Sequence, residues 1–165
     1  SFHEIAVGSE FIEDGESIPI DAYSEDSVDS LDGLNIVGVL VTINHQDDET
    51  VSGAGCTLAD PPQDDTVDAS IGHSDLSASD SSTSSFDFQL DWHNSTLIDT
   101  TVSNMTKSEI EAMLDGGEFG FGDYELVLGV TVQNGGGTLC TSDDSGQDVD
   151  YKIELVSLDY TITAV

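Results

Sequence analysis

Carboxylates are the side chains best able to carry chemistry in this sequence, and they gather in two acidic runs. Calcium takes roughly six to eight oxygen ligands, which clustered aspartates in a glycine-containing loop can supply. Neither run has the spacing of an EF-hand loop, and a chain so rich in aspartate also forms clusters by chance. The sequence therefore leaves two interpretations open, a calcium site or a solvated acidic loop, and it requires no cofactor. The candidate calcium ligands are Asp26, Asp29, Asp32, Asp143 and Asp144.

The residues that usually act as nucleophiles, general bases or zinc ligands have no productive spacing. His3, His45, His73 and His93 are scattered over expected loops and strand ends, and no pair has zinc-ligand spacing, so we expect them at the surface. The turn at residues 72–75 lacks the closing glycine and the preceding apolar strand of a nucleophile elbow. A glycosidase needs paired carboxylates in an aromatic-rimmed cleft, whereas aromatic residues make up 7% of the chain. We therefore expect a protein that is not an enzyme.

Two cysteines and two glycosylation sequons indicate the cell exterior. Cys56 and Cys140 are the only cysteines, and two cysteines in a secreted β-rich domain are usually bridged. Asn94 and Asn104 each begin an Asn-X-Thr sequon. The sequence starts with Ser1, which fits a chain that begins after a removed signal segment. We therefore predict an extracellular glycoprotein with a Cys56–Cys140 disulfide and N-glycans on both asparagines.

The charge balance excludes two classes of partner. Among 165 residues there are 34 Asp or Glu and 2 Lys or Arg, for a formal net charge of −32. Such a surface cannot make the phosphate contacts of a nucleic-acid-binding protein or dock on an anionic membrane. No apolar run approaches the roughly 20 residues of a membrane-spanning helix. In molar salt the Debye length falls to about 3 Å, which screens the self-repulsion of the surface, so we expect a halophilic, archaeal protein.

Most apolar residues fall in strand-length segments. The clearest is residues 86–92, where Phe86, Phe88, Leu90 and Trp92 share one face and acidic or amide side chains occupy the other. Residues 71–85 are mostly Ser, Asp and Gly and are expected to be the least structured stretch. Further strands are expected in one or two pieces of 1–23, in 34–44, 50–58, 96–103 and 120–133, near 139–141, and in 149–165 with a bulge or turn near 156–157.

One short helix is expected at residues 107–115. Thr106 stands three residues before Glu109, which is the spacing of a capping box. Ile110 and Leu114 recur at helical spacing, and the glycine at 116 predicts the end. With turn signals about every ten residues, the chain is predicted to be a single domain over 1–165. Its expected fold is an all-β, antiparallel, jelly-roll-like β-sandwich of about eight to ten strands.

Three features of the chain match a known architecture: the apolar N-terminal segment at residues 2–7, the all-β body and the terminal segment 151–165. In outline they resemble archaeal extracellular filament subunits of the TasA/camelysin-like bundling-pilus or thread type. The resemblance implies donor-strand complementation, in which residues 1–12 of one subunit complete the sheet of the next. The expected contact residues of this donor strand are Phe2, Ile5 and Val7.

Two functions remain open at this point. The first is a secreted structural subunit of a haloarchaeal cell-surface filament, which forms a homopolymer or homo-oligomer by strand addition. The second is a surface adhesin, a virion spike or decoration protein, or a glycan-binding module that does not polymerise. The two differ in the role of residues 1–12, which only the filament requires for assembly.

Overall fold

The computed structural model describes residues 1–24, 31–46, 51–52, 64–133, 141–142 and 144–164. These residues form ten strands, one α-helix and one short 3-10 helix. The strands are β1 (Phe2–Glu13), β2 (Ser17–Tyr23), β3 (Ile36–His45), β4 (Val51–Ser52), β5 (Thr66–His73), β6 (Leu76–Ser82), β7 (Phe86–Asp91), β8 (Asp123–Thr131), β9 (Thr141–Ser142) and β10 (Gly146–Ser157), and the helices are η2 (Ser95–Leu97) and α2 (Lys107–Leu114).

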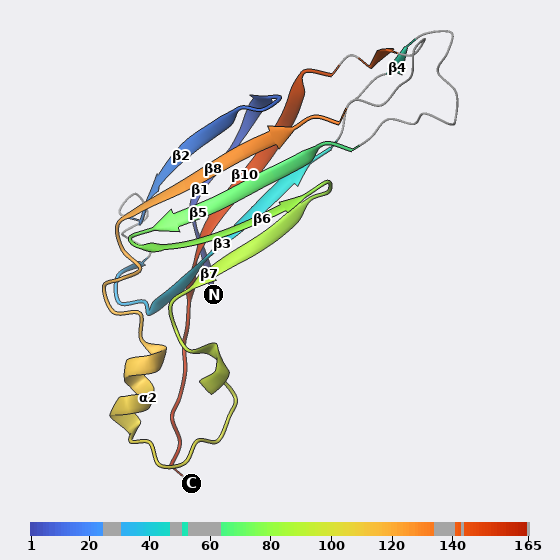
Figure 1. Cartoon of the computed structure of the whole chain (residues 1–165). Helices are drawn as coiled ribbons and strands as arrows, with labels where there is room; N and C mark the ends of the chain where they lie inside the picture. The colour runs from blue at the N-terminus through green and yellow to red at the C-terminus, as the bar shows by residue number, and fades with distance from the viewer. Residues whose placement is uncertain (25–30, 47–50, 53–63, 134–140, 143, 165) are drawn as a thin grey trace.

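Two four-stranded antiparallel sheets pack against each other as a β-sandwich (Figure 1). The first sheet has the order β1-β10-β3-β7 and the second has the order β2-β8-β5-β6. If the eight longer strands are numbered along the chain, these orders read 1-8-3-6 and 2-7-4-5, which is the connectivity of a jelly roll. The predicted fold class is therefore confirmed.

Alternation of side chains along the strands builds the core between the two sheets. On β8, Tyr124, Leu126, Leu128 and Val130 are buried, while the residues between them are exposed or half-buried. The strand expected at residues 34–44 is β3, which lies between β10 and β7. It is buried at most positions, as expected for a strand inside a sheet.

The β5–β6 hairpin contradicts the expectation that residues 71–85 are the least structured stretch. β5 lies inside the second sheet and buries Val67, Ala69 and Ile71. β6 is an edge strand with one neighbour, so small polar side chains are sufficient along its exposed positions. The serine and aspartate residues here belong to a solvent-exposed edge strand. Their composition alone does not distinguish such a strand from a loop.

Residues 96–103 do not form the predicted strand. The Asn94 side chain caps η2, with its Oδ1 accepting from the backbone N of Thr96 at 3.2 Å and from the Thr96 hydroxyl at 2.6 Å. Such local bonds compete with ladder formation. The segment between β7 and α2 therefore leaves the sandwich and forms, with α2, a helical end (Figure 1).

The predicted helix and its capping box are confirmed. The Thr106 hydroxyl accepts from the backbone N of Glu109 at 3.3 Å, and the Glu109 carboxylate accepts from the backbone N of Thr106 at 2.7 Å. The bond from the Thr106 backbone holds the pKa of Glu109 below its ordinary value. No helix in the described part of the chain is long and apolar enough to cross a membrane.

The terminal segment fits the prediction only in part. The pairing of β10 with β3 shifts register between Val156 and Ser157, where the sequence predicts a bulge. Beyond Ser157, however, residues 158–164 belong to no strand. The predicted strand to residue 165 is therefore wrong over 158–164, because no neighbouring strand of the described chain continues beside it.

Candidate functional site

The outer face of β1 carries the largest exposed apolar side chains of the first sheet. Phe2, Val7 and Phe11 are 58%, 63% and 49% exposed. A β-bulge lies between Glu4 and Ala6, and it shifts the alternation by one residue. The shift places Phe2 on the same face as Val7 and Phe11, although their numbers differ in parity. The result is an apolar row on a strand at the edge of a sheet.

β1 is also an integral part of its own sandwich. It pairs with β10 from Phe2, opposite Val156, to Glu13, opposite Gly146. Ile12 is fully buried in the core, and Ile5 is half-buried and packs against it. Of the predicted contact residues, Phe2 and Val7 thus face solvent and Ile5 faces the core. The other edge of β1 pairs with no strand within the described residues.

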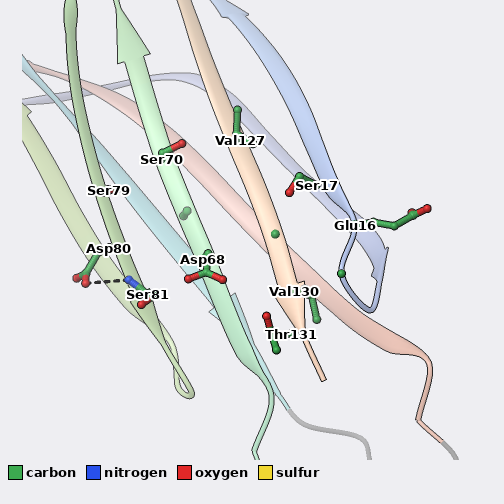
Figure 2. Close-up of a pocket in the computed structure, with 13 residues that line it drawn as sticks. Glu16, Ser17, Asp68, Ser70, Ser79, Asp80, Ser81, Val127, Val130 and Thr131 are labelled. Atoms are coloured by element: carbon green, nitrogen blue, oxygen red, sulfur yellow. Dashed lines mark hydrogen bonds between the residues drawn. The ribbon is translucent and has the colours of Figure 1, made fainter. Parts of the chain in front are cut away.

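A second candidate is an open groove of about 490 Å³ on the outer face of the second sheet (Figure 2). One row across the sheet consists of Ser17, Gly129, Asp68 and Ser81, on β2, β8, β5 and β6. Gly129 leaves open space in the middle of this row, because it has no side chain there. An added Cβ would lie 3.3 Å from the Ser17 hydroxyl oxygen. The groove therefore exists because small residues meet across four strands.

The chemistry of the groove is that of hydroxyl and carboxylate groups. Figure 2 shows Asp68 and Ser70 on β5, with Ser79, Asp80 and Ser81 on β6 beside them. These groups can exchange hydrogen bonds with a hydroxyl-rich ligand, and the lining carboxylates, among them Glu16 and Asp68, disfavour an anionic one. Among the described residues, no aromatic side chain lines the groove. The arrangement suits a neutral polyol or sugar better than a phosphate.

The predicted calcium ligands are not brought together in the described part of the chain. Asp26, Asp29 and Asp143 lie outside the described residues. Asp32 is exposed, and one Asp144 oxygen accepts from the backbone N of Gly146 at 3.2 Å. Among the described residues, no three His, Cys, Asp or Glu side chains form a group that could hold a metal ion. A calcium site stays a prediction.

Both sequons lie on the segment between β7 and α2, and both asparagines are exposed. Asn94 caps η2 through its Oδ1. Asn104 has a backbone φ of +66°, a conformation that asparagine tolerates better than most residues. Thr106, the third residue of the Asn104 sequon, is also the N-cap of α2. Glycans at these positions would therefore project from the helical end of the molecule.

The prediction that the histidines lie at the surface is wrong for His45 and His73, which are 8% and 5% exposed, and for His93, whose side chain is 6% exposed. His73 Nδ1 lies 2.8 Å from the carbonyl oxygen of Asp123, and its Nε2 contacts that of Phe119. Its ring stacks on Tyr124 with 4.1 Å between centroids. His73 thus connects the end of β5 to the segment that enters β8, which is a structural role.

The cysteines Cys56 and Cys140 lie outside the described residues, so their bridge stays a prediction. The short strands β4 and β9 flank them in the sequence, and these two strands pair, with Ser52 opposite Thr141. The pairing thus joins two described pieces of chain that precede Cys56 and follow Cys140 in the sequence. β4 lies at the end opposite α2 (Figure 1).

Sequence reasoning missed Phe11 and the polar groove. Phe11 lies on the same face of β1 as Phe2 only because of the bulge between Glu4 and Ala6. This bulge has no signature in the sequence. The groove draws on residues from four strands whose registers only the folded sheet sets. The one available signal for the groove is the repeated serine of residues 77–82, a composition that is also typical of unstructured chain.

Comparison with known proteins adds no identity to these two surfaces. No protein-family model matches the chain, and no curated protein matches it significantly.

Proposed function

We propose that this protein is a secreted, non-enzymatic structural subunit of a haloarchaeal cell-surface filament, similar to a pilus or thread. Its subunits assemble by β-strand addition through β1. The observation that carries the proposal is the apolar row on this strand. Six large hydrophobic side chains are clearly exposed in the described chain, and three of them, Phe2, Val7 and Phe11, lie on β1.

An exposed apolar edge strand is a surface on which copies of a chain associate. Its unpaired N–H and C=O groups form a template for another strand, and burial of apolar side chains drives the association. The net charge of −32 opposes contact between copies in dilute salt. In molar salt this repulsion acts over only about 3 Å, so the medium of a halophile favours assembly.

Two routes of strand addition fit β1. In the first, β1 stays paired with β10 and accepts a strand along its other edge. In the second, β1 leaves and completes the sheet of the next subunit, as the filament resemblance implies. The second route exchanges identical contacts between subunits, as in domain swapping, and it must break and reform the burial of Ile12.

The other predicted properties belong to the same proposal. Exposed sequons at Asn94 and Asn104 support N-glycans on the outside of a filament. The β4–β9 pairing supports the Cys56–Cys140 disulfide. Together they favour an extracellular location, and calcium in the acidic loops is an optional ligand that assembly does not require.

The test is assembly in molar sodium chloride, measured by light scattering and negative-stain imaging. An edge variant combines Phe2→Ser, Val7→Ser and Phe11→Ser, which leave the β1–β10 ladder and the core intact. A matched control combines Tyr23→Ser, Ile98→Ser and Met113→Ser, which remove the three exposed hydrophobic side chains that lie elsewhere. We expect polymers from the wild type and the control and none from the edge variant. Equal assembly of all three proteins contradicts the proposal.

Deletion of residues 1–12 is a weaker test than the edge variant. The deletion removes Ile12 from the core and exposes the β10 edge that β1 covers. Loss of assembly would then report unfolding as readily as loss of a contact. The three outward substitutions separate these effects, because surface substitutions usually change stability by no more than about 0.5 kcal/mol.

The groove of the second sheet supports a second candidate, a surface adhesin, virion spike or decoration protein, or glycan-binding module. Its serine hydroxyls and the carboxylates of Glu16 and Asp68 offer hydrogen bonds to a neutral sugar. Isothermal titration with neutral oligosaccharides tests this function. We expect binding that Gly129→Val removes by filling the groove. The matched control is Gly72→Val on β5, which does not line the groove and where an added Cβ would lie 3.9 Å from the Glu125 carbonyl oxygen. If the protein binds none of these oligosaccharides and the edge variant loses assembly, only the filament function remains supported.

A further inference from the structure

Residues 158–164, here called the C-terminal segment, are extended but belong to no strand of the described chain (Figure 1). The backbone N of Leu158 donates to the carbonyl of Asn35 at 2.9 Å. Beyond that bond, no backbone group of residues 159–164 makes a hydrogen bond within the described chain. Burial nevertheless alternates as in a strand: Leu158, Tyr160 and Ile162 are half-buried, and the residues between them are exposed.

Side-chain contacts hold this segment in place although its backbone is unpaired. The Asn35 amide donates to the carbonyl of Leu158 at 3.3 Å, and the Tyr160 hydroxyl donates to Asp115 Oδ1 at 2.6 Å. Figure 1 shows the segment continuing straight from β10 past the end of the sheet and alongside the helical end. It is thus held extended before it meets a partner strand, which reduces the entropy cost of pairing.

The sequence of the C-terminal segment also favours a paired strand. Tyr160, Thr161, Ile162 and Thr163 are all residue types enriched in β-sheets. The segment therefore has a strand-forming sequence and an extended backbone, but its backbone N–H and C=O groups are unpaired in the described chain. Local sequence preference and the fold disagree at this place. Such conflicts are expected at functional positions.

The four edge strands of the sandwich differ in their ability to accept this segment. β2 contains Pro19, which cannot donate to a ladder. β6 is rich in serine, and β7 presents the charged side chains of Asp87 and Asp91 outward. β1 has no proline, and after its bulge it pairs without interruption from Ala6 to Glu13. Its outward row of Val7, Ser9 and Phe11 has no charge.

We propose that the C-terminal segment of one copy pairs with the free edge of β1, near residues 6–11, in a second copy. The proposal rests on the filament function and names the contact that joins its subunits. The row Leu158, Tyr160, Ile162 has no charged member, so two uncharged rows meet within a molecule of net charge −32. Aromatic and β-branched neighbours across strands stabilise such a pair.

Proline substitutions in the C-terminal segment test the pairing. Thr161→Pro and Ile162→Pro, made separately, remove backbone donors that point to opposite edges of an extended strand. Neither donor is used in the single chain, so both variants are expected to keep the wild-type melting temperature. Thr161→Val is the control, because it keeps the N–H and the strand preference.

The measurements are light scattering over a concentration series in molar sodium chloride and amide hydrogen exchange of residues 159–164. We expect these amides to exchange freely when the protein is dilute and at least about tenfold more slowly when it assembles. One of the two proline variants loses assembly and thereby identifies the edge that pairs. Thr161→Val assembles like the wild type.

The outcomes separate this proposal from the filament function. If the edge variant loses assembly while amides 159–164 stay unprotected and both proline variants assemble, the C-terminal pairing is wrong and the filament function stands. If these amides gain protection but the edge variant assembles normally, β1 is not the acceptor and the proposed pairing fails. A wild type that stays monomeric at every concentration overturns both.

Discussion

The N-terminal strand β1 and the C-terminal segment 158–164 have similar apolar, strand-forming sequences, yet only β1 is paired. β1 lies along β10 for its whole length and places Ile12 in the core. The C-terminal segment continues β10 past the point where β1 and β3 end, so it has no neighbour in the described chain. The difference shows that strand preference becomes a strand only where a second backbone is within reach.

β1 and the C-terminal segment also contribute differently to the core and to the exposed surface. β1 contributes core residues on one face and an exposed apolar row on the other, so it can be both part of the fold and a contact surface. The C-terminal segment contributes little to the core, and its open backbone is available for a partner. The predictions below test this division, from the largest expected effect to the smallest.

The same substitution at the two ends should have very different effects on stability. Ile12→Ala empties a fully buried site and is expected to lower the free energy of unfolding by about 2–5 kcal/mol. Ile162→Ala acts on a half-buried side chain of the unpaired segment and should cost less than about 1 kcal/mol. Urea unfolding of both variants in molar salt measures the two values. Similar losses would show that the C-terminal segment is part of the core.

Asn35 is the residue that attaches the C-terminal segment to the sandwich. Its amide donates to the carbonyls of Leu114 and Leu158 at 3.0 and 3.3 Å, and its Oδ1 accepts from the backbone N of Gly116 at 2.8 Å. Asn35→Ala should lower the free energy of unfolding by about 1–3 kcal/mol and make residues 158–164 more sensitive to protease.

Asn44→Ala is the matched control for this change. Asn44 lies on β3, the strand that Asn35 immediately precedes, and is exposed. Its replacement should therefore change stability by no more than about 0.5 kcal/mol. Equal protease sensitivity in Asn35→Ala and the wild type would mean that other contacts fix the C-terminal segment.

The helix that supports the C-terminal segment depends on its cap. Thr106→Ala removes the capping box of α2 and should destabilise the helix by about 1 kcal/mol, seen as faster amide exchange in residues 109–114. Asn104→Asp is the control, because it removes the same sequon, tolerates the positive φ of this position and leaves the cap. If both variants change exchange equally, the effect comes from the sequon residue and not from the cap.

The smallest expected effect is a change of the Tyr160 contact with pH. The hydrogen bond to Asp115, followed by burial and the negative charges of Asp115 and Glu111, raises the pKa of Tyr160 to about 12. A raised pKa means that the fold favours the neutral phenol. Its contribution is complete below the ordinary tyrosine pKa of about 10 and is lost as the pH rises through about 12.

Ultraviolet absorbance of tyrosinate follows this titration. Asp115→Asn removes the charge beside Tyr160 and should move one tyrosine back toward its ordinary pKa, whereas Tyr160→Phe removes that titration step. Unchanged curves for Asp115→Asn would indicate that the Tyr160–Asp115 bond does not hold the C-terminal segment in solution.

Local patterns in the sequence determined several elements of this fold. Alternation in residues 86–92 predicted which side chains face the core, because a strand points successive residues to opposite faces. The spacing of Thr106 and Glu109 predicted the start of α2, because both partners of a capping box lie within one turn. The shift of apolar phase near Val156 predicted the irregularity of β10. These features depend on neighbours in the chain, and the sequence alone contains them.

Tertiary structure decided the features on which the candidate sites depend. The bulge between Glu4 and Ala6 aligns Phe2 with Phe11, and registers across four strands create the groove around Gly129. Residues 76–82 form a strand because β5 lies beside them, whereas residues 158–164 remain unpaired because no strand of the described chain lies beside them. In each case the outcome depends on a backbone distant in sequence. Strand pairing is a non-local interaction, so residue types specify the strand but not its neighbour.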